Sequence, residues 1–182
     1  MQPDIKNGYK NLKKLGNITT PFGGRTKDEP FHPGVDVANA KGTPIPAFSP
    51  GVVTSVKTGF KNGDNGYGNT VQIRDGRGGV HQYAHLQQPL VRPGQVINQN
   101  QQIGLMGDSG SSYSPKGGDS SHLDYRVMGP DGKYINPTAI TGNVTSVGKG
   151  GKGGAGKIDA IVKKLLTVKT KQKHPLTYLS KK

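Results

Sequence analysis

Four of the five histidines in this 182-residue chain lie in three short segments that also carry carboxylates or polar side chains. Segment 121–127 has His122 and Asp124 two residues apart, and its alternating polar and apolar residues are typical of a β-strand. On a strand these two side chains share one face, about 7 Å apart. Taken alone, the pattern fits a surface strand with polar residues facing water equally well.

A second segment places His32 and Asp36 four residues apart, with Gly34 between them. Pro30 and Pro33 flank the histidine and keep this stretch out of a helix. An imidazole and a carboxylate at this spacing can chelate one ion only if the chain bends between them. We expect Gly34 to permit that bend.

The third segment, 79–86, also alternates, which predicts that His81, Tyr83 and His85 share one strand face. His81 and His85 would then be ~13 Å apart, too far to reach one ion. We therefore interpret His81 as lining a groove at best and Tyr83 as a packing residue. Short His/Asp clusters separated by long intervals are typical of a metal site assembled from distant strands.

The composition indicates which elements must position these residues. Hydrophobic residues make up only 30% of the chain, whereas Gly 29 and Pro 13 are high. This favours an all-β fold with many tight turns over a helical bundle. The Asp75-Gly76 pair predicts a hairpin. The predicted strands cover residues 42–47, 51–56, 69–74, 79–86, 101–107 and 121–127.

The chain divides into three parts by composition. Residues 1–16 form a polar N-terminal arm, and residues 17–142 form the main domain. Residues 143–182 form a linker and a basic tail. Residues 148–156 are almost entirely Gly and Lys, which is typical of a flexible linker. Residues 157–167 have the spacing of an amphipathic helix.

The net charge is +14, and lysines are concentrated in the last quarter of the chain. Such a tail is attracted to polyanions, which include DNA, RNA, teichoic-acid-like wall polymers and anionic membranes, and charge alone does not choose among them. No aromatic residues alternate with these lysines, which argues against specific nucleic-acid binding. The chain has no cysteine, so disulfides and thiolate metal ligands are excluded. No apolar run approaches a membrane span, and no signal peptide is visible.

The order of several motifs resembles the M23 (lysostaphin/LytM-type) zinc endopeptidases. The resemblance covers roughly residues 17–140. The motifs are Phe22-Gly-Gly-Arg25, His32-Pro-Gly-Val-Asp36, Gly42-Thr-Pro44, Gly66-Tyr-Gly-Asn69, Tyr83-Ala-His-Leu86, Gln102-Ile-Gly104 and His122-Leu-Asp124. It implies an antiparallel β fold with a groove, one zinc ion, and hydrolysis of peptide bonds in bacterial peptidoglycan.

The resemblance also implies roles for individual residues. His32 and Asp36 match the first two metal ligands of the family. His85 and His122 match the pair that orients the attacking water and stabilises the transition state. The third ligand of the family is the second histidine of a His-x-His motif, and here that position is Asp124.

Asp124 in place of a histidine changes the expected metal chemistry. A carboxylate oxygen can bind zinc at a distance similar to that of an imidazole nitrogen. Two carboxylates, however, neutralise a divalent ion, which makes the site a weaker Lewis acid. We expect Zn²⁺, with Mn²⁺ as a second candidate because harder oxygen ligands favour it.

Three hypotheses follow from the sequence. The first is a zinc endopeptidase that lyses the cell wall, on the wall-facing side of a cell or as a phage lysin. The second is a weak or inactive M23-like module that binds the wall or activates another wall enzyme. The third is a structural component of a phage tail, in which the basic tail would be an attachment element.

Overall fold

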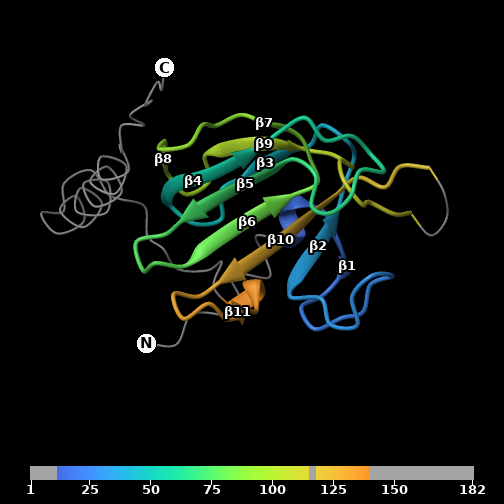
Figure 1. Cartoon of the computed structure of the whole chain (residues 1–182), viewed down its shortest axis with the longest axis horizontal. Helices are drawn as coiled ribbons and strands as arrows, with labels where there is room; N and C mark the ends of the chain where they lie inside the picture. The colour runs from blue at the N-terminus through green and yellow to red at the C-terminus, as the bar shows by residue number, and fades with distance from the viewer. Residues whose placement is uncertain (1–11, 115–117, 140–182) are drawn as a thin grey trace, which may run out of the picture.

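The computed structural model describes residues 12–114 and 118–139, and these residues form two antiparallel β-sheets (Figure 1). The predicted antiparallel all-β fold is confirmed. The elements are β1 (Asn17–Thr20), β2 (Gly34–Ala38), β3 (Pro44–Pro46), β4 (Gly51–Lys57), β5 (Thr70–Arg74), β6 (Val80–Ala84), β7 (Leu86–Pro89), β8 (Val96–Ile97), β9 (Gln102–Met106), β10 (His122–Met128), β11 (Tyr134–Ile135) and the short 3-10 helix η1 (Pro137–Ala139).

The large sheet has the strand order β1-β2-β10-β6-β5-β4-β8, with β11 paired to the end of β10. β10 is an interior strand of this sheet and lies between β2 and β6. In the observed register Asp124 faces Asp36 on β2 and Ala84 on β6. The predicted hairpin at Asp75-Gly76 is confirmed by the pairing of β5 with β6.

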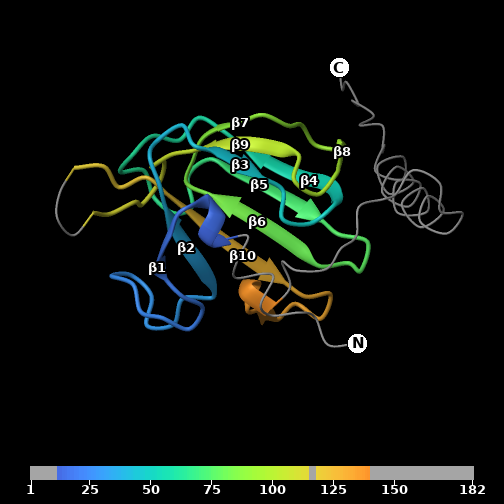
Figure 2. The same cartoon turned by 180° about the vertical axis from the view of Figure 1, so that it is seen from behind.

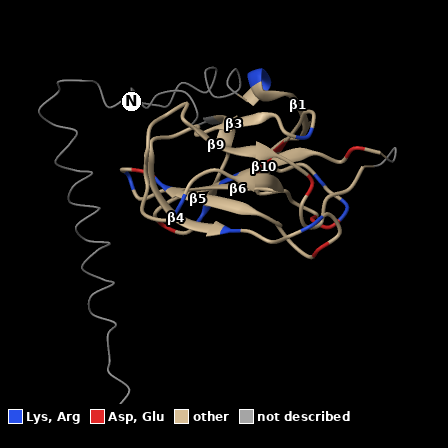
Figure 3. Cartoon of the chain, turned by 90° about the horizontal axis from the view of Figure 1, so that it is seen from above, with Lys and Arg blue, Asp and Glu red and all other residues tan. Residues whose placement is uncertain are grey.

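The small sheet, in the order β3-β9-β7, packs on one side of the large sheet (Figure 3). Both sheets contribute to one hydrophobic core. An aromatic cluster of Phe48, Tyr83 and Tyr125 lies in this core, with ring centroids 4.8–5.9 Å apart. The backbone N–H of Phe48 donates to the buried Tyr83 hydroxyl at 2.8 Å, so Tyr83 is a packing residue, as predicted.

The alternation of β10 matches the sequence prediction. Leu123, Tyr125 and Val127 face the core. Asp124 and Arg126 lie on the opposite face of the sheet, yet they too are buried. Loops cover that face, as the contacts of Arg126 with Glu29 and Tyr67 show. The polar face of this interior strand is therefore an enclosed site, not a solvated surface.

The structure also differs from expectation at three places. The two strands predicted at 42–47 and 51–56 belong to different sheets, because β3 pairs with β9 and β4 pairs with β5 and β8. Residues 12–15 are helical and lie beside β2 (Figure 2). Leu12 and Leu15 belong to the core although they fall within the predicted N-terminal arm. The domain boundaries themselves stay predictions.

The predicted linker and the predicted helix at 157–167 lie outside the described residues. Within the described ranges, no helix has the length and apolar character needed to cross a membrane.

Candidate metal centre

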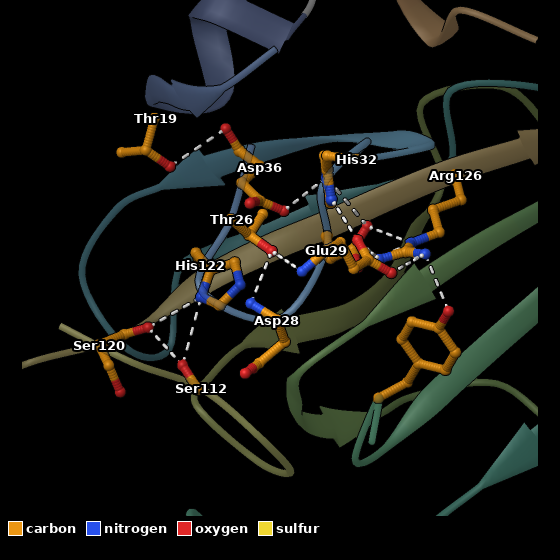
Figure 4. Close-up of polar contacts among 12 residues, drawn as sticks. Thr19, Thr26, Asp28, Glu29, His32, Asp36, Ser112, Ser120, His122 and Arg126 are labelled. Carbon is orange, nitrogen blue, oxygen red and sulfur yellow. Dashed lines mark hydrogen bonds and ion pairs between the residues drawn. The ribbon is translucent and has the colours of Figure 1, made fainter. Parts of the chain in front are cut away.

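His32, Asp36 and Asp124 converge on one buried point beside β10. Figure 4 shows the side chains of His32 and Asp36 pointing toward each other. Each offers one ligand atom, and these atoms lie within 4.8 Å of one another. Asp36 on β2 and Asp124 on β10 are register partners, so strand pairing alone brings their carboxylates together. His32 reaches the same point from the loop that precedes β2.

Two backbone hydrogen bonds hold that loop and place His32. The His32 N–H donates to the Gly24 carbonyl at 2.7 Å, and the Gly23 N–H donates to the His32 carbonyl at 2.9 Å. Thr26 Oγ1 accepts the Glu29 backbone N–H at 3.0 Å. These hydrogen bonds therefore hold the loop independently of the side chains that form the metal site.

Gly34 has a different role from the one the sequence suggests. The chain bends between His32 and Asp36, as expected, but the bend is at Pro33, whereas Gly34 begins β2 and does not have a positive φ. A Cβ at Gly34 would lie 2.7 Å from Arg126 Cγ and 2.8 Å from Asp124 Oδ1. The missing side chain leaves the space that these two side chains fill.

His32 presents a free nitrogen to the site. Its Nδ1 lies 2.9 Å from Glu29 Oε2, and because an ionised carboxylate only accepts, Nδ1 carries the hydrogen. Nε2 lies 3.1 Å from Asp36 Oδ1 and 3.8 Å from Asp124 Oδ1. This buried Nε2 makes no hydrogen bond. A buried imidazole lone pair facing two carboxylates is a donor set that suits a divalent cation.

The ionisation of the cluster reflects these contacts. Burial lowers the pKa of His32, but the Asp36 carboxylate 3.1 Å from Nε2, together with Asp124 and Glu29, outweighs this effect and raises that pKa. Burial raises the pKa of Asp36, but His32 and the charge of His122 lower it below its usual value. The cluster thus holds either a proton on His32 or a cation against its carboxylates.

Asp124 is held by Arg126, two residues along the same strand face. Arg126 Nε donates to both carboxylate oxygens of Asp124, at 3.0 and 2.9 Å. Its two terminal nitrogens donate to the two oxygens of Glu29, each at 3.0 Å. Burial lowers the pKa of Arg126, but bonds to Asp124 and Glu29 raise it further above its usual value.

Glu29, Arg126 and Tyr67 are site residues that the sequence reasoning missed. A signal for Arg126 was present, because His122, Asp124 and Arg126 alternate on one strand face. A signal for Glu29 was weaker, since only its position three residues before His32 marked it. The partnership between Glu29 and Arg126, 97 residues apart, is a tertiary contact.

His85 and His122 stand beside the cluster, with ring centroids 4.6 Å apart. His85 Nδ1 lies 2.7 Å from the Ser109 carbonyl, so this nitrogen carries the hydrogen and Nε2 is the acceptor in the neutral ring. Burial and the neighbouring His122 lower the pKa of His85. His122 Nδ1 lies 2.9 Å from the Ser120 carbonyl and 3.3 Å from Ser112 Oγ.

The prediction that His81, Tyr83 and His85 share a face is wrong for His85, because β6 ends at Ala84, whereas His81 and Tyr83 do share a face of β6. His85 has a left-handed φ of 58°, which turns its side chain out of the strand alternation. His81 is buried and lies 2.7 Å from the Tyr125 hydroxyl and 3.3 Å from Asp75 Oδ2, so it does not line a groove.

The chain is similar to several known proteins. The chain is 35% identical over 146 residues to the DD-carboxypeptidase/endopeptidase Mpg of Neisseria meningitidis, covering 74% of this chain and 30% of that protein. It is 34% identical over 109 residues to the peptidoglycan DD-endopeptidase ShyC of Vibrio cholerae, covering 60% of this chain and 22% of that protein. The matched region is thus less than a third of these relatives' length.

The fold is that of the lysostaphin-like peptidases. The structure of the antimicrobial peptidase lysostaphin from Staphylococcus simulans superposes with a TM-score of 0.54 at 26% identity, covering 67% of this chain and 48% of that one. The model of peptidase family M23 matches residues 30–137, which include the three candidate ligands as well as His85 and His122. The chain therefore belongs to peptidase family M23.

Proposed function

We propose that this chain is a metal-dependent endopeptidase that hydrolyses peptide bonds in bacterial peptidoglycan. The observation that carries the proposal is the buried, unpaired Nε2 of His32 facing the carboxylates of Asp36 and Asp124. We infer that these three residues hold zinc, with manganese as a second candidate ion. The M23 relatives named as peptidoglycan endopeptidases support the substrate class.

The ligand set has a formal charge suited to a divalent ion. Asp36, Asp124 and Glu29 contribute three negative charges and Arg126 one positive charge, which gives −2 with a neutral His32. This balance equals the simple count of two carboxylates, because the charges of Glu29 and Arg126 cancel. When bound, the ion would polarise the scissile carbonyl and acidify a water molecule.

His85 and His122 would transfer the protons in the hydrolysis reaction. Because its pKa is lowered, His85 is neutral near pH 7, and its Nε2 can accept a proton from the attacking water. The same nitrogen can then donate that proton to the leaving amine as the C–N bond breaks. His122, whose Nδ1 is engaged by the Ser120 carbonyl, can donate from Nε2 to the developing oxyanion when its ring is protonated.

The test is turnover of purified peptidoglycan by the zinc-loaded chain, measured as release of new amino termini. We expect release to stop with a chelator and with His122→Ala, while His122→Ala still binds zinc in a calorimetric titration. His174→Ala, in the basic tail, is the matched control and should cleave as the wild type does. Intact peptidoglycan after incubation with the zinc-loaded wild type would refute the proposal.

One observation favours a second candidate function, that of a catalytically weak or inactive module that activates another wall enzyme. Both oxygens of Asp124 already receive hydrogen bonds from Arg126. If the guanidinium competes with an ion for this carboxylate, the site holds little metal. A titration that finds no ion at stoichiometric occupancy, together with stimulation of a wall amidase, would establish this alternative.

We further propose that the basic tail binds anionic wall polymers and that the protein acts facing the cell wall, either secreted or as part of a phage particle. The support is the concentration of lysines after residue 143. Removal of residues 143–182 should weaken binding to isolated walls but leave cleavage of a soluble peptide unchanged. Unaltered wall binding by the shortened chain would contradict this role.

A further inference from the structure

Two of the three proposed ligands, His32 and Asp124, are connected to each other through Glu29 and Arg126. Figure 4 shows the part of this connection that includes His32, Glu29 and Arg126. Asp124 accepts from Arg126, Arg126 donates to Glu29, and Glu29 accepts from Nδ1 of His32. This chain of charged hydrogen bonds, which we call the Glu29–Arg126 clamp, runs from one ligand to another.

The clamp is fully engaged. Nε and one terminal nitrogen of Arg126 contact Asp124, and this terminal nitrogen lies 2.8 Å from Asp124 Oδ2. Both terminal nitrogens donate to Glu29. The remaining donor goes to the Tyr67 hydroxyl at 2.8 Å. The guanidinium carbon also lies 4.6 Å from the centre of the Tyr67 ring. Arg126 is only 5% exposed, so its five N–H groups are directed almost entirely at these partners.

Each end of the Glu29–Arg126 clamp fixes the orientation of one ligand. An aspartate is shorter than a histidine, and its carboxylate turns freely unless it is held. The planar fork of Arg126 fixes the carboxylate plane of Asp124 with Oδ1 on the side of His32. At the other end, Glu29 holds the hydrogen of His32 on Nδ1, which leaves Nε2 available.

We propose that Glu29 and Arg126 are positioning residues that allow an aspartate to serve as the third metal ligand of this chain. This inference rests on the proposed function, because it assumes that the cluster binds a divalent cation. Neither residue belongs to the proposed ligand set of His32, Asp36 and Asp124. They act through Asp124 and His32, and Arg126 joins the two ligands so that they are placed together.

The first test is metal binding by the full chain carrying Arg126→Lys. Lysine keeps the positive charge but lacks the fork, so this variant separates orientation from charge. We expect zinc affinity to fall about 10- to 100-fold, as is typical when an outer partner of a metal ligand is lost. With Co²⁺ as a probe, the visible absorption spectrum should change in shape, because Asp124 no longer has a fixed direction.

Two further variants keep the test independent of folding. Glu29→Gln lies in a partly exposed loop position and should weaken zinc binding about 10-fold, because one amide oxygen cannot replace both carboxylate contacts. Arg74→Lys is the matched control. Arg74 donates to the Gly78 carbonyl in the hairpin between β5 and β6, away from the ligands, and its loss should leave zinc affinity unchanged.

A second experiment tests whether position 124 and Arg126 form one unit. Asp124→His gives an imidazole at the third ligand position but leaves the buried guanidinium beside the ion with Glu29 as its one carboxylate partner. We expect Asp124→His/Arg126→Gln to bind zinc at least 10-fold more tightly than Asp124→His alone. Equal zinc affinities of the two variants would show that the role of Arg126 does not depend on an aspartate at position 124.

The outcomes separate the clamp from the proposed function. Wild-type zinc affinity and Co²⁺ spectra in both Arg126→Lys and Glu29→Gln would overturn the clamp and leave the endopeptidase proposal intact. Tighter binding by Arg126→Lys would show that Arg126 obstructs the site, which also overturns it. Wild type that binds no ion refutes both ideas. Weakened variants with a wild type that binds zinc but cleaves nothing would uphold the clamp and refute only the endopeptidase proposal.

Discussion

Replacing Gly34 by alanine tests how the backbone makes room for the site. The added Cβ would lie 2.7 Å from Arg126 Cγ, 2.8 Å from Asp124 Oδ1 and 2.9 Å from the Tyr125 carbonyl oxygen. Contacts this short require movement of the neighbours. Arg126 cannot move cheaply, because its guanidinium is bonded to Asp124, Glu29 and Tyr67, and the Tyr125 oxygen belongs to the paired interior strand.

The expected cost of Gly34→Ala is that of inserting a methyl group into a packed interior, about 1–3 kcal/mol. At about 4 °C per kcal/mol for a domain of this size, the melting temperature should fall by roughly 4–12 °C. Because Asp124 Oδ1 is one of the displaced atoms, zinc affinity should fall as well, by about 10-fold or more.

Differential scanning calorimetry and a zinc titration of the same sample measure both effects. Gly76→Ala is the matched control, since a Cβ there meets nothing within 4 Å. It should leave stability unchanged or raise it slightly. If Gly34→Ala melts within 1–2 °C of the wild type, the estimate from packing cost fails. Unchanged zinc affinity in that variant would refute the reasoning that this glycine makes space for the ligand.

Three other outcomes are expected. Asp75→Asn should lower stability by about 1–2 kcal/mol at pH 7, because it removes the charge beside His81. Burial raises the pKa of Asp75, but His81 and backbone N–H groups lower it overall. The stabilisation by the Asp75 carboxylate is fully present above the ordinary aspartate pKa of about 3.9 and is lost as the pH falls through the lower pKa of Asp75 in the folded protein. The difference in stability between the variant and the wild type should therefore shrink when melting is measured in acid. Tyr83→Phe should cost about 1–2 kcal/mol in chemical denaturation, because the buried Phe48 N–H loses its acceptor; a neutral effect would mean that water replaces the hydroxyl. Zinc at 100 times its dissociation constant should stabilise the fold by about 2.7 kcal/mol and raise the melting temperature, with reversal by chelator, whereas no shift would argue against a native metal site.

Much of the fold follows from local patterns. The alternation of segment 121–127 placed Leu123, Tyr125 and Val127 on one face and His122 and Asp124 on the other, as the structure has them. The hairpin at Asp75-Gly76 was also predictable from turn chemistry. Sheet membership was not, because the partners of β3 and β4 depend on contacts far along the chain.

The position of His85 shows where periodicity fails as a guide. Alternation along 79–86 placed it with His81, but the strand ends one residue earlier and a left-handed φ redirects the side chain. A backbone turn of that kind is held by tertiary contacts, such as the bond from the His85 N–H to the Tyr67 carbonyl at 2.9 Å. Histidine adopts a positive φ more often than most residues other than glycine, but not often enough for the residue type alone to predict this turn.

The sequence by itself determined the residue types for the candidate centre and their spacing, including the aspartate at position 124. Only the tertiary structure decided that His32 Nε2 is buried without a hydrogen bond and that Arg126 and Glu29 connect two of the candidate ligands. The physical reason is that spacing along a strand fixes which face a side chain occupies. The burial and the partners of that face depend on loops that are distant in sequence.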